Sequence, residues 1–435
     1  MMKHSLFLSA IIVVAGLSLS CSCKVEEHRL GPVTPVTPDA PPDDGPAKTD
    51  AATLNGTLLR TSAADPSIAY CKGRFYMTMT GSSNIAMVSD TDLSNLTTAA
   101  HSNSANLIYK SADDPSVTEI FGEGAKINGT WSPEIHYFSE DDCPGNSGWY
   151  IVVALRMDDS KGNGEKSAAY IRPVVLKSLS DTPAGPYGDP VTGVEGKTRR
   201  FLDANGDPFT DWAIGVSFLR IPSGKYKGIY ATWVDEVGRG EGYGKFYQRL
   251  RIAKFSKPWQ IASAAATITT PTQAWEQKGA SSTLPMVVEG GTAVYGEHGE
   301  IFLTYCGSGY WSDYGQGQLT LKREGDDYAD PLLETSWIKY AKNPVFSSVK
   351  SSDLRGAGHA FFFQDAAGNP MMCYHAYPYI NGVKQSSRNA YVEPYTIDYN
   401  DKSKTAPQGV LKFGLLGTGV TAPVDSKITW YKKAD

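Results

Sequence analysis

A unit of short β-strands recurs along most of this chain and constrains its fold more than any other feature. Each unit has a β-run that begins with a polar or aromatic residue, a turn containing glycine, a second apolar run and further short strands. The units begin at Asp65, Trp131, Trp212, Glu289 and His359, at intervals of 66, 81, 77 and 70 residues. Several short strands per unit at roughly regular spacing are typical of a propeller. We therefore predict an all-β fold, a five-bladed β-propeller.

A β-sandwich, or a pair of sandwiches, is the competing architecture. Propeller repeats are usually shorter than these intervals, so each blade must also carry loops. The chain has 435 residues, enough for one enlarged all-β domain or for two or three smaller ones. A net charge of -5 does not favour nucleic acid as a partner, whereas 24 Tyr and 9 Trp suit both sugar stacking and sheet packing.

The first 20 residues predict export. Residues 1–20 have a short basic start, an apolar run and small residues before Cys21, typical of a signal peptide and too short for a spanning helix with flanks. The segment resembles a bacterial lipobox, with Ser18 where leucine is usual and Cys23 as a second candidate. The charged segment 24–27 resembles the export signal of surface lipoproteins in the Bacteroidetes. We predict lipidation at Cys21 and an outer-membrane lipoprotein, facing outward or into the periplasm.

Composition also divides the rest of the chain. Residues 29–52 are dense in Pro, Asp and Thr and cannot form a core, so we predict an extended tether over residues 21–55. The propeller is expected over residues 56–435. Four further cysteines allow three disulfide pairings, and Cys306, inside an apolar strand, is expected to be a buried free thiol.

Two carboxylates are the candidate catalytic groups. Glu289 follows apolar residues and precedes two glycines, so it faces close backbone and little water, which raises the pKa of a carboxyl and suits it to deliver a proton. Asp65 begins a strand, and Pro66 after it restricts the backbone. The alternatives are a strand-end glutamate paired with a lysine and an ordinary Asp-Pro turn.

Propeller geometry brings such residues together. The first strand of each blade lines the central channel, so Asp65, Glu134, Glu289 and His359 are expected to meet at one mouth. One carboxylate that activates water and another that protonates the leaving oxygen can hydrolyse a glycosidic bond. If they stand about 6.5 to 9.5 Å apart, the reaction inverts the anomeric centre. We assign Asp65 as the base and Glu289 as the acid.

Several short motifs, in order from about Asp65 to about Tyr399, resemble those of glycoside hydrolase family 43. The family consists of five-bladed propellers that cleave arabinofuranosides and xylosides. The segment 310–317 resembles in particular its exo-acting α-L-arabinofuranosidase branch. The motifs are Asp65-Pro66-Ser67-Ile68, Trp131-Ser132-Pro133-Glu134-Ile135-His136, Glu289-Gly290-Gly291, Gly356-Ala357-Gly358-His359 and Cys373-Tyr374-His375-Ala376.

The chain departs from this family at one position. The resemblance implies a third acid, an Asp after Ile at the start of blade three, which orients the proton donor and raises its pKa. Here Ile214 is followed by Gly215. Loss of that carboxylate would lower the pKa of Glu289 and free its rotamer. Asp211 lies on the same strand face as residue 215 but about 13 Å away at ~3.3 Å per residue, so we do not expect it to substitute.

The remaining site residues have supporting roles. Trp131 and Trp212 are expected to stack on a sugar or to pack in the core, and Trp311 to contact substrate. Glu134 is expected to orient groups at the pocket. The resemblance implies that His359 contacts substrate or holds a hydrated structural calcium ion near the channel centre; otherwise it is a polar core residue. The sequence has no HExxH, CxxC, GxSxG or acidic calcium loop, so we expect hydrolysis that requires no cofactor.

The resulting hypothesis is an inverting, exo-acting glycosidase that releases α-L-arabinofuranose from plant cell-wall oligosaccharides or polysaccharides. A β-xylosidase and an endo-arabinanase are alternatives within the enzyme class. A surface glycan-binding protein with a decayed active site is the alternative outside it, and Gly215 is the feature that favours it.

Overall fold

The computed structural model describes most of the chain after residue 56. Contacts divide the chain into Met1–Pro46 and Ala47–Asp435, and every described residue belongs to the second unit. The predicted signal peptide 1–20, lipidation site Cys21 and tether 21–55 lie outside the described residues. The described ranges are 57–97, 106–157, 170–348, 353–401 and 403–413. Within these described ranges no helix is long and apolar enough to span a membrane.

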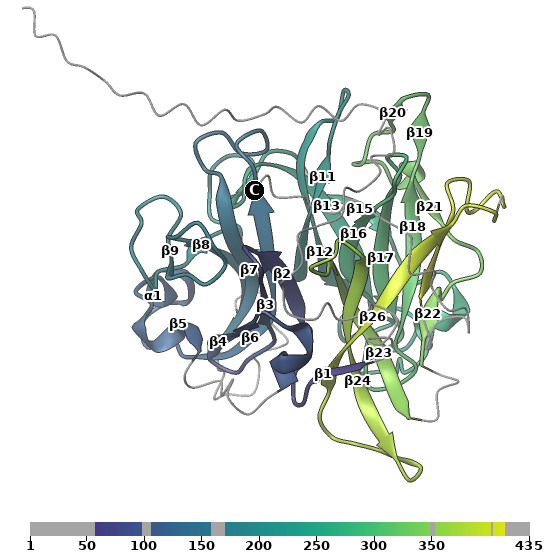
Figure 1. The fold of residues 1–435 in the computed structure, drawn as a ribbon, viewed down its shortest axis with the longest axis horizontal. Coiled ribbons are helices and arrows are strands. Elements are labelled where there is room, and N and C mark those ends of the chain that lie inside the picture. The colour runs from purple at the N-terminus through teal and green to yellow at the C-terminus, as the bar shows by residue number, and fades with distance from the viewer. Residues whose placement is uncertain (1–56, 98–105, 158–169, 349–352, 402, 414–435) are drawn as a thin grey trace, which may run out of the picture. The chain divides into compact units, whose positions relative to one another are not determined.

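Five antiparallel sheets form the blades of a β-propeller, which confirms the predicted fold (Figure 1). Each first strand contacts the first strands of both neighbouring blades, so these strands make a closed ring around the channel. All five predicted unit starts lie in these strands or just before them. The first strands are β2 (Ser67–Cys71), β6 (Ile127–Phe138), β11 (Ile214–Ile221), β16 (Val288–Tyr295) and β23 (Leu354–Gln364).

The outer strands complete each blade. Blade 1 adds β3 (Arg74–Thr78), β4 (Asn84–Asp90) and β5 (Leu107–Lys110); blade 2 adds β7 (Gly148–Met157), β8 (Ile171–Ser178), β9 (Tyr187–Gly188) and β10 (Arg199–Arg200). Blade 3 adds β12 (Gly228–Val237), β13 (Tyr247–Lys257), β14 (Gln260–Ile261) and β15 (Ala266–Thr269). Blade 4 adds β17 (Ile301–Gly307), β18 (Gly315–Leu321), β21 (Trp337–Lys339) and β22 (Phe346–Ser347). A small hairpin, β19 (Arg323–Glu324) with β20 (Asp327–Tyr328), and the helix α1 (Ser116–Phe121) lie in connections.

Blade 5 contains strands from both ends of the described chain. It joins β24 (Pro370–Ile380), β25 (Val383–Lys384), β26 (Asn389–Asp398) and β27 (Val410–Phe413) with β1 (Thr57–Arg60). β1 pairs with β26 in antiparallel register, and Figure 1 shows it in purple beside the yellow-green strands of blade 5. Just after β1, the Ala63 backbone N–H donates to the carbonyl of Arg388 at 2.9 Å. The closure of the ring therefore brings the start of blade 1 against the loop before β26.

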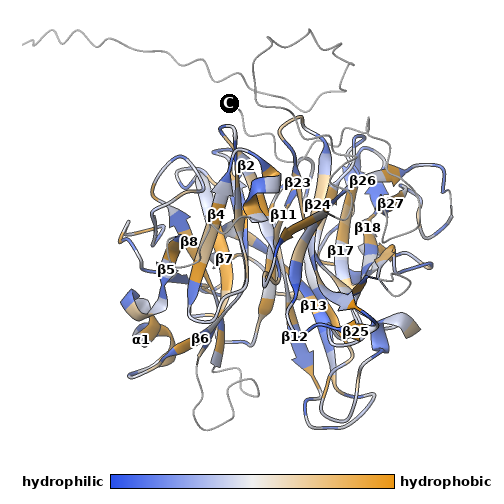
Figure 2. Cartoon of the chain, turned by 60° about the horizontal axis from the view of Figure 1, so that its bottom comes forward, coloured by the Kyte–Doolittle hydropathy of each residue, from blue (hydrophilic) through white to orange (hydrophobic). Residues whose placement is uncertain are grey.

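Apolar side chains fill the space between neighbouring blades. Figure 2 shows β7, whose residues are mostly buried, largely in the hydrophobic colours. Between blades 4 and 5, Phe302 of β17 packs in a cluster with Phe346, Tyr374 and Phe413. The predicted free thiol is also confirmed, because Cys306 is buried and forms no disulfide. Cys143 and Cys373 are free and buried as well, and Cys71 is also buried.

One residue at the channel in each blade has a left-handed backbone. The φ angles are 52° at Asp65, 49° at Ser132, 57° at Gly215, 60° at Gly290 and 52° at His359. In blades 2 to 5 the pairing register between the first and second strands shifts at this point, as in a β-bulge. Non-glycine residues rarely adopt this conformation. Because it recurs once in every blade, we infer that the propeller fold requires it at this position. Gly215 therefore occupies in blade 3 the position that Asp65 occupies in blade 1.

Phe302→Ala should destabilise the protein by about 3 to 5 kcal/mol, because it leaves a cavity between blades 4 and 5 where the native ring is fully buried. Urea unfolding followed by tryptophan fluorescence measures the change. Val383→Ala is the control, since Val383 is 61% exposed and its removal should cost less than about 0.5 kcal/mol. Equal unfolding midpoints for the two variants would contradict the proposed packing.

Candidate active site

Asp65 lies just before β2, and its carboxylate is enclosed by nitrogen donors. Its Oδ1 is 2.9 Å from His375 Nδ1, 3.2 Å from Arg388 Nη1 and 3.4 Å from His359 Nδ1. Its Oδ2 accepts a hydrogen bond from Thr80 Oγ1 at 2.6 Å. Blade 5 supplies His359 and His375, and the loop before β26 supplies Arg388. The partners of Asp65 therefore come mainly from the C-terminal part of the chain.

These neighbours hold Asp65 in its ionised form. Burial alone would raise the pKa of Asp65, but Arg388, His359 and His375 outweigh it and hold that pKa well below its usual range. Burial, together with Arg388, lowers the pKa of His375 to about 4, so its imidazole is neutral at neutral pH. His375 Nδ1 accepts a hydrogen bond from the Asp65 backbone N–H at 3.2 Å and lies beside Oδ1. One lone pair of Oδ2 remains for a water molecule.

Glu289 has the opposite electrostatic character. It lies in β16, half-buried, and its Oε1 accepts a hydrogen bond from the Tyr314 hydroxyl at 2.7 Å. Burial raises the pKa of Glu289, and the negative charge of Asp65 raises it further. His359, the Tyr314 hydrogen bond and Arg388 oppose the shift without cancelling it. Two interacting carboxyl groups with pKa values displaced in opposite directions are the arrangement expected of a base and an acid.

Tyr314 joins the two carboxylates into one structure. Its ring stacks on His375 with centroids 5.6 Å apart and planes at 3°. Its hydroxyl thus contacts Glu289 while its ring supports the imidazole that contacts Asp65. The Tyr314 ring also lies close to the backbone of β23, since a Cβ on Gly358 would lie 2.5 Å from the ring. These packing contacts fix the relative placement of Asp65 and Glu289.

Glycine lines the channel beside Glu289. A Cβ on Gly290 would lie 3.4 Å from His359 Nδ1, and a Cβ on Gly215 would lie 3.5 Å from the Gly290 nitrogen. Gly215 thus faces β16, the strand that carries Glu289, but it has no side-chain carboxylate. Asp211 is exposed, and its charge acts on Arg172. The structure therefore shows no role for Asp211 at Glu289.

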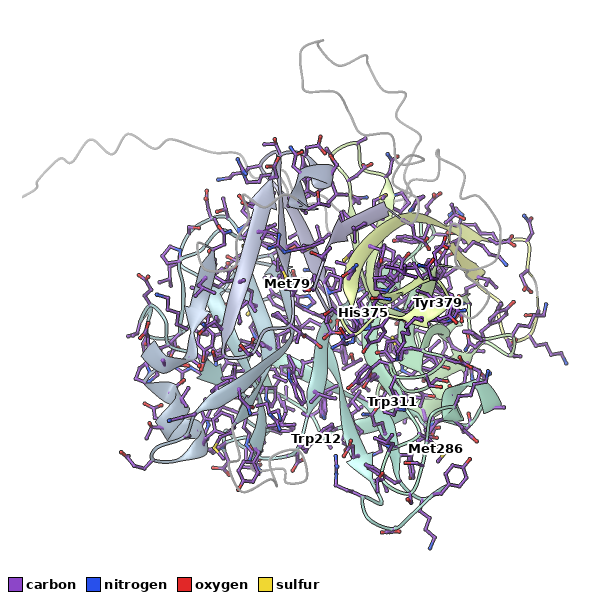
Figure 3. All side chains as sticks on the ribbon, turned by 90° about the horizontal axis from the view of Figure 1, so that it is seen from below. Met79, Trp212, Met286, Trp311, His375 and Tyr379 are labelled. Atoms are coloured by element: carbon purple, nitrogen blue, oxygen red, sulfur yellow. The ribbon has the colours of Figure 1, made fainter. Side chains whose placement is uncertain are left out.

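The three predicted aromatic residues have different settings. Trp131 is half-buried with the Arg156 guanidinium 5.6 Å from its ring centroid. Trp212 packs against the apolar cluster between blades 3 and 4, and its buried Nε1–H has no hydrogen-bond partner among the described residues. Trp311 Nε1–H donates to the Gly279 carbonyl at 2.9 Å, which fixes the ring. In Figure 3, Met79, Trp212, Trp311 and Tyr379, from four blades, are arranged around His375. Sugar contact by these tryptophans stays a prediction.

Glu134 lies in β6 and is paired within its own strand. It is buried, and its Oε2 is 2.9 Å from His136 Nε2. The adjacent Pro133 carbonyl accepts a hydrogen bond from Thr78 Oγ1 at 2.8 Å, which ties this segment of blade 2 to blade 1. The structure thus gives Glu134 a partner within its own strand, and its role towards substrate stays a prediction.

The sequence motifs missed three groups at the mouth. Arg388 lies in a loop without a recognisable motif, and only the closure of the ring reveals its contact with Asp65. Tyr314 lies within the segment 310–317, but its bond to Glu289 depends on tertiary structure. Tyr310 is 39% exposed, and the Arg388 guanidinium lies 4.9 Å from its ring centroid. The Arg388 guanidinium therefore contacts both an accessible aromatic ring and Asp65.

No group of three or more His, Cys, Asp and Glu side chains within the described ranges is arranged to hold a metal ion. His359 Nε2 is buried and has no hydrogen-bond partner in this part of the chain. This nitrogen can accept a hydrogen bond or bind a hydrated cation. A structural calcium ion at His359 stays a prediction with that single nitrogen as its protein ligand.

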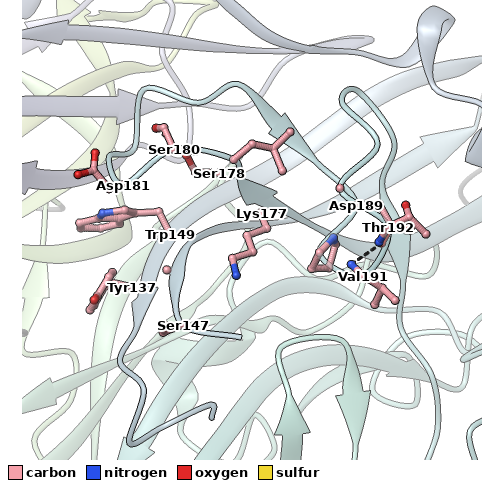
Figure 4. A pocket seen from close by; sticks show the side chains of 14 residues that line it. Tyr137, Ser147, Trp149, Lys177, Ser178, Ser180, Asp181, Asp189, Val191 and Thr192 are labelled. Carbon is pink, nitrogen blue, oxygen red and sulfur yellow. Dashed lines mark hydrogen bonds between the residues drawn. The ribbon is translucent and has the colours of Figure 1, made fainter. Parts of the chain in front are cut away.

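A separate hollow of about 720 Å³ lies beyond the far end of β6 (Figure 4). Its wall includes Tyr137, Trp149, Lys177 and Asp181, and none of the predicted site residues. Asp189, also in the wall, is already paired with Arg199. This hollow is therefore distinct from the mouth that holds Asp65 and Glu289.

Glu289→Gln should stabilise the folded protein more at about pH 8 than at about pH 4. Between the ordinary and the raised pKa of Glu289 the folded state binds more protons than the unfolded state, so its stability falls as pH rises. Each unit of upward shift is worth about 1.4 kcal/mol. The glutamine removes this loss and retains an acceptor for Tyr314. Urea unfolding at both pH values measures the difference.

Asp65→Asn is the matched comparison with the opposite sign. It removes a carboxylate whose pKa is depressed and leaves Arg388 without its partner, so it should destabilise the protein at neutral pH. A Glu289→Gln effect that is the same at both pH values would show that the pKa of Glu289 is not raised.

The chain is similar in sequence to known proteins. A profile of "Glycosyl hydrolases family 43" matches residues 56–402. The chain is 29% identical over 269 residues to "Alpha-L-arabinofuranosidase 43" of Humicola insolens, covering 61% of this chain and 46% of that one. It is 32% identical over 247 residues to "Extracellular exo-alpha-(1->5)-L-arabinofuranosidase" of Streptomyces avermitilis, covering 56% and 42%. The chain thus spans less than half the length of these two relatives.

Solved structures agree on the fold. The α-L-arabinofuranosidase of Lactobacillus brevis superposes with a TM-score of 0.61 at 23% identity, over 83% of this chain and 97% of that one. A thermostable family-43 glycoside hydrolase superposes with a TM-score of 0.58 at 16% identity, over 85% and 99%. Since the family profile spans most of the chain, and the five-bladed fold agrees with it, this protein belongs to glycosyl hydrolases family 43.

Proposed function

We propose that this protein is an inverting, exo-acting α-L-arabinofuranosidase that removes arabinofuranose from plant cell-wall oligosaccharides or polysaccharides. The observation that carries the proposal is the opposite displacement of the pKa values of Asp65 and Glu289 within one mouth. Both curated relatives described above bear the name of an arabinofuranosidase, one of them exo-acting on the 1→5 linkage.

The proposed reaction moves two protons, one from the attacking water to Asp65 and one from Glu289 to the leaving oxygen. A water molecule at the free lone pair of Asp65 Oδ2 gives its proton to the carboxylate as its oxygen attacks C1 of the sugar. The C1–O bond to the leaving group breaks, and Glu289 gives its proton to that oxygen. The low pKa of Asp65 makes it a weak base. Arg388, His375 and Thr80 offset this by holding the carboxylate, and hence the water, in one orientation.

The mouth offers groups that suit a single sugar. Tyr310 presents an accessible ring beside Arg388. An aromatic ring of this kind matches the apolar face of a furanose. A β-xylosidase or an endo-arabinanase would use the same two carboxylates. Product size on linear arabinan separates exo from endo cleavage, since exo cleavage yields monosaccharide only.

The second candidate function is a glycan-binding protein with a disabled site. Gly215 favours it, because the channel position that faces Gly290 has no carboxylate. Such a protein would bind arabino-oligosaccharides without cleaving them, and Gly215→Asp would restore cleavage. Asp can adopt the required backbone, since Asp65 does so at the equivalent position of blade 1.

We further propose that the protein acts as a lipoprotein of the outer membrane. This rests on residues 1–20 and Cys21, which precede the described residues. Metabolic labelling with a radioactive fatty acid should mark the parent and not Cys21→Ser. Labelling of the two to the same extent would remove the support for the anchor.

Glu289→Gln should lower kcat on arabino-oligosaccharides by about 10² to 10⁴-fold, because general acid catalysis contributes about that much. An aryl α-L-arabinofuranoside with a good leaving group should lose far less, since its leaving oxygen needs no proton. Proton NMR of the first product formed should show the inverted anomer. Retention of configuration would contradict the mechanism, and a parent that binds but cleaves neither substrate would support the glycan-binding alternative.

A further inference from the structure

Several charged or titratable groups surround Glu289, and their balance decides whether it keeps a proton. Tyr314 donates to it, and His359 and Arg388 favour its ionised form. Asp65 favours the protonated form, but the Arg388 guanidinium, 3.2 Å from Asp65 Oδ1, offsets part of its charge. Cys306, the strand partner of Glu289, is a buried thiol. A further anion near Glu289 would shift this balance towards the proton-bearing acid.

Glu236 lies at the end of β12, on the face that packs against β16. Side chains alternate along a strand, so Thr232, Val234 and Glu236 share one face. Thr232 Oγ1 donates to the Gly291 carbonyl at 2.8 Å, two residues after Glu289. Val234 packs in one apolar cluster with Val288, the residue before Glu289. Glu236 therefore lies on the face of β12 that packs against β16, the strand of Glu289.

The neighbouring strand fixes the same end of this blade to blade 4. Glu236 pairs in register with Gln248 of β13. The Gln248 backbone N–H donates to the Met286 carbonyl at 2.9 Å, and Met286 N–H donates to the Phe246 carbonyl at 3.0 Å. Met286 is three residues before Glu289. The segment leading to the acid is thus hydrogen-bonded beside Glu236.

Glu236 is enclosed and held in place. Its side chain is 10% exposed and forms an ion pair with Arg239. The Gln248 side chain hydrogen-bonds to it. Burial, with a smaller contribution from Glu289, raises the pKa of Glu236 to about 6 against the opposing charge of Arg239. The two carboxyl groups therefore interact, and at neutral pH Glu236 is ionised.

We propose that Glu236 is the positioning residue that holds the proton on Glu289, in place of a carboxylate at position 215. This inference rests on the proposed function of Glu289 as the acid. Glu236 reaches Glu289 from the second strand of blade 3, whereas an Asp at position 215 would reach it from the first strand. Arg239 and Gln248 keep Glu236 charged and fixed.

Glu236→Gln tests this assignment, since it removes the charge and retains the shape. The variant should lower kcat on arabino-oligosaccharides by about tenfold to a hundredfold, below the whole contribution of a general acid. KM should not change. An aryl α-L-arabinofuranoside with a good leaving group should be cleaved at nearly the parent rate. Glu236→Asp should recover part of the loss, and Gly215→Asp introduced into Glu236→Gln should recover most of it.

Asp235→Asn is the matched control. Asp235 lies on the opposite face of β12, where it pairs with Arg249 and Arg251, so its loss should affect stability but not the dependence on leaving group. Equal losses by Glu236→Gln on both substrates, or a raised KM alone, would make Glu236 a substrate contact and overturn the inference. An unchanged variant would also overturn it. A parent that cleaves neither substrate would instead overturn the proposed function.

Discussion

The ion pair between Asp65 and Arg388 is the interaction on which the site depends. It joins the start of the first blade to the last, and it exists only because β1 pairs with β26 and brings residue 63 against residue 388. The arginine offsets the cost of burying the carboxylate and keeps it ionised. The charge of Asp65 in turn raises the pKa of Glu289, so ring closure and the difference between the two carboxylates are coupled.

The left-handed residue in each blade explains why the site lies where it does. In blades 2 to 5 the first strand bulges at this position, and the local backbone sets the direction of the side chain. Three blades place chemistry at or next to this point: Asp65, Glu289 beside Gly290, and His359. Blade 3 has Gly215 there, which leaves space instead of charge. Glu236, on the next strand of that blade, is the carboxylate closest in role to the missing one.

Sequence alone predicted the blades and the two carboxylates because both depend on local patterns. Strand units show as apolar runs with glycine turns, and Glu289 shows as an acid in apolar surroundings. Arg388 and the placement of β1 in blade 5 could not be predicted, since each depends on a pairing more than 300 residues apart along the chain. Glu236 was missed because nothing around it in sequence is unusual. Its burial and its neighbour follow only from strand register.

The central claim is that Glu289 keeps its proton where Asp65 has lost its own. Infrared difference spectroscopy of the parent minus Glu289→Gln, between about pH 4 and pH 8, measures this directly, because a protonated carboxyl absorbs apart from a carboxylate. We predict that the protonated band of Glu289 persists above the ordinary glutamate pKa. The matching spectrum with Asp65→Asn should show only carboxylate over the same range. Titration of both groups at their ordinary values would contradict the account.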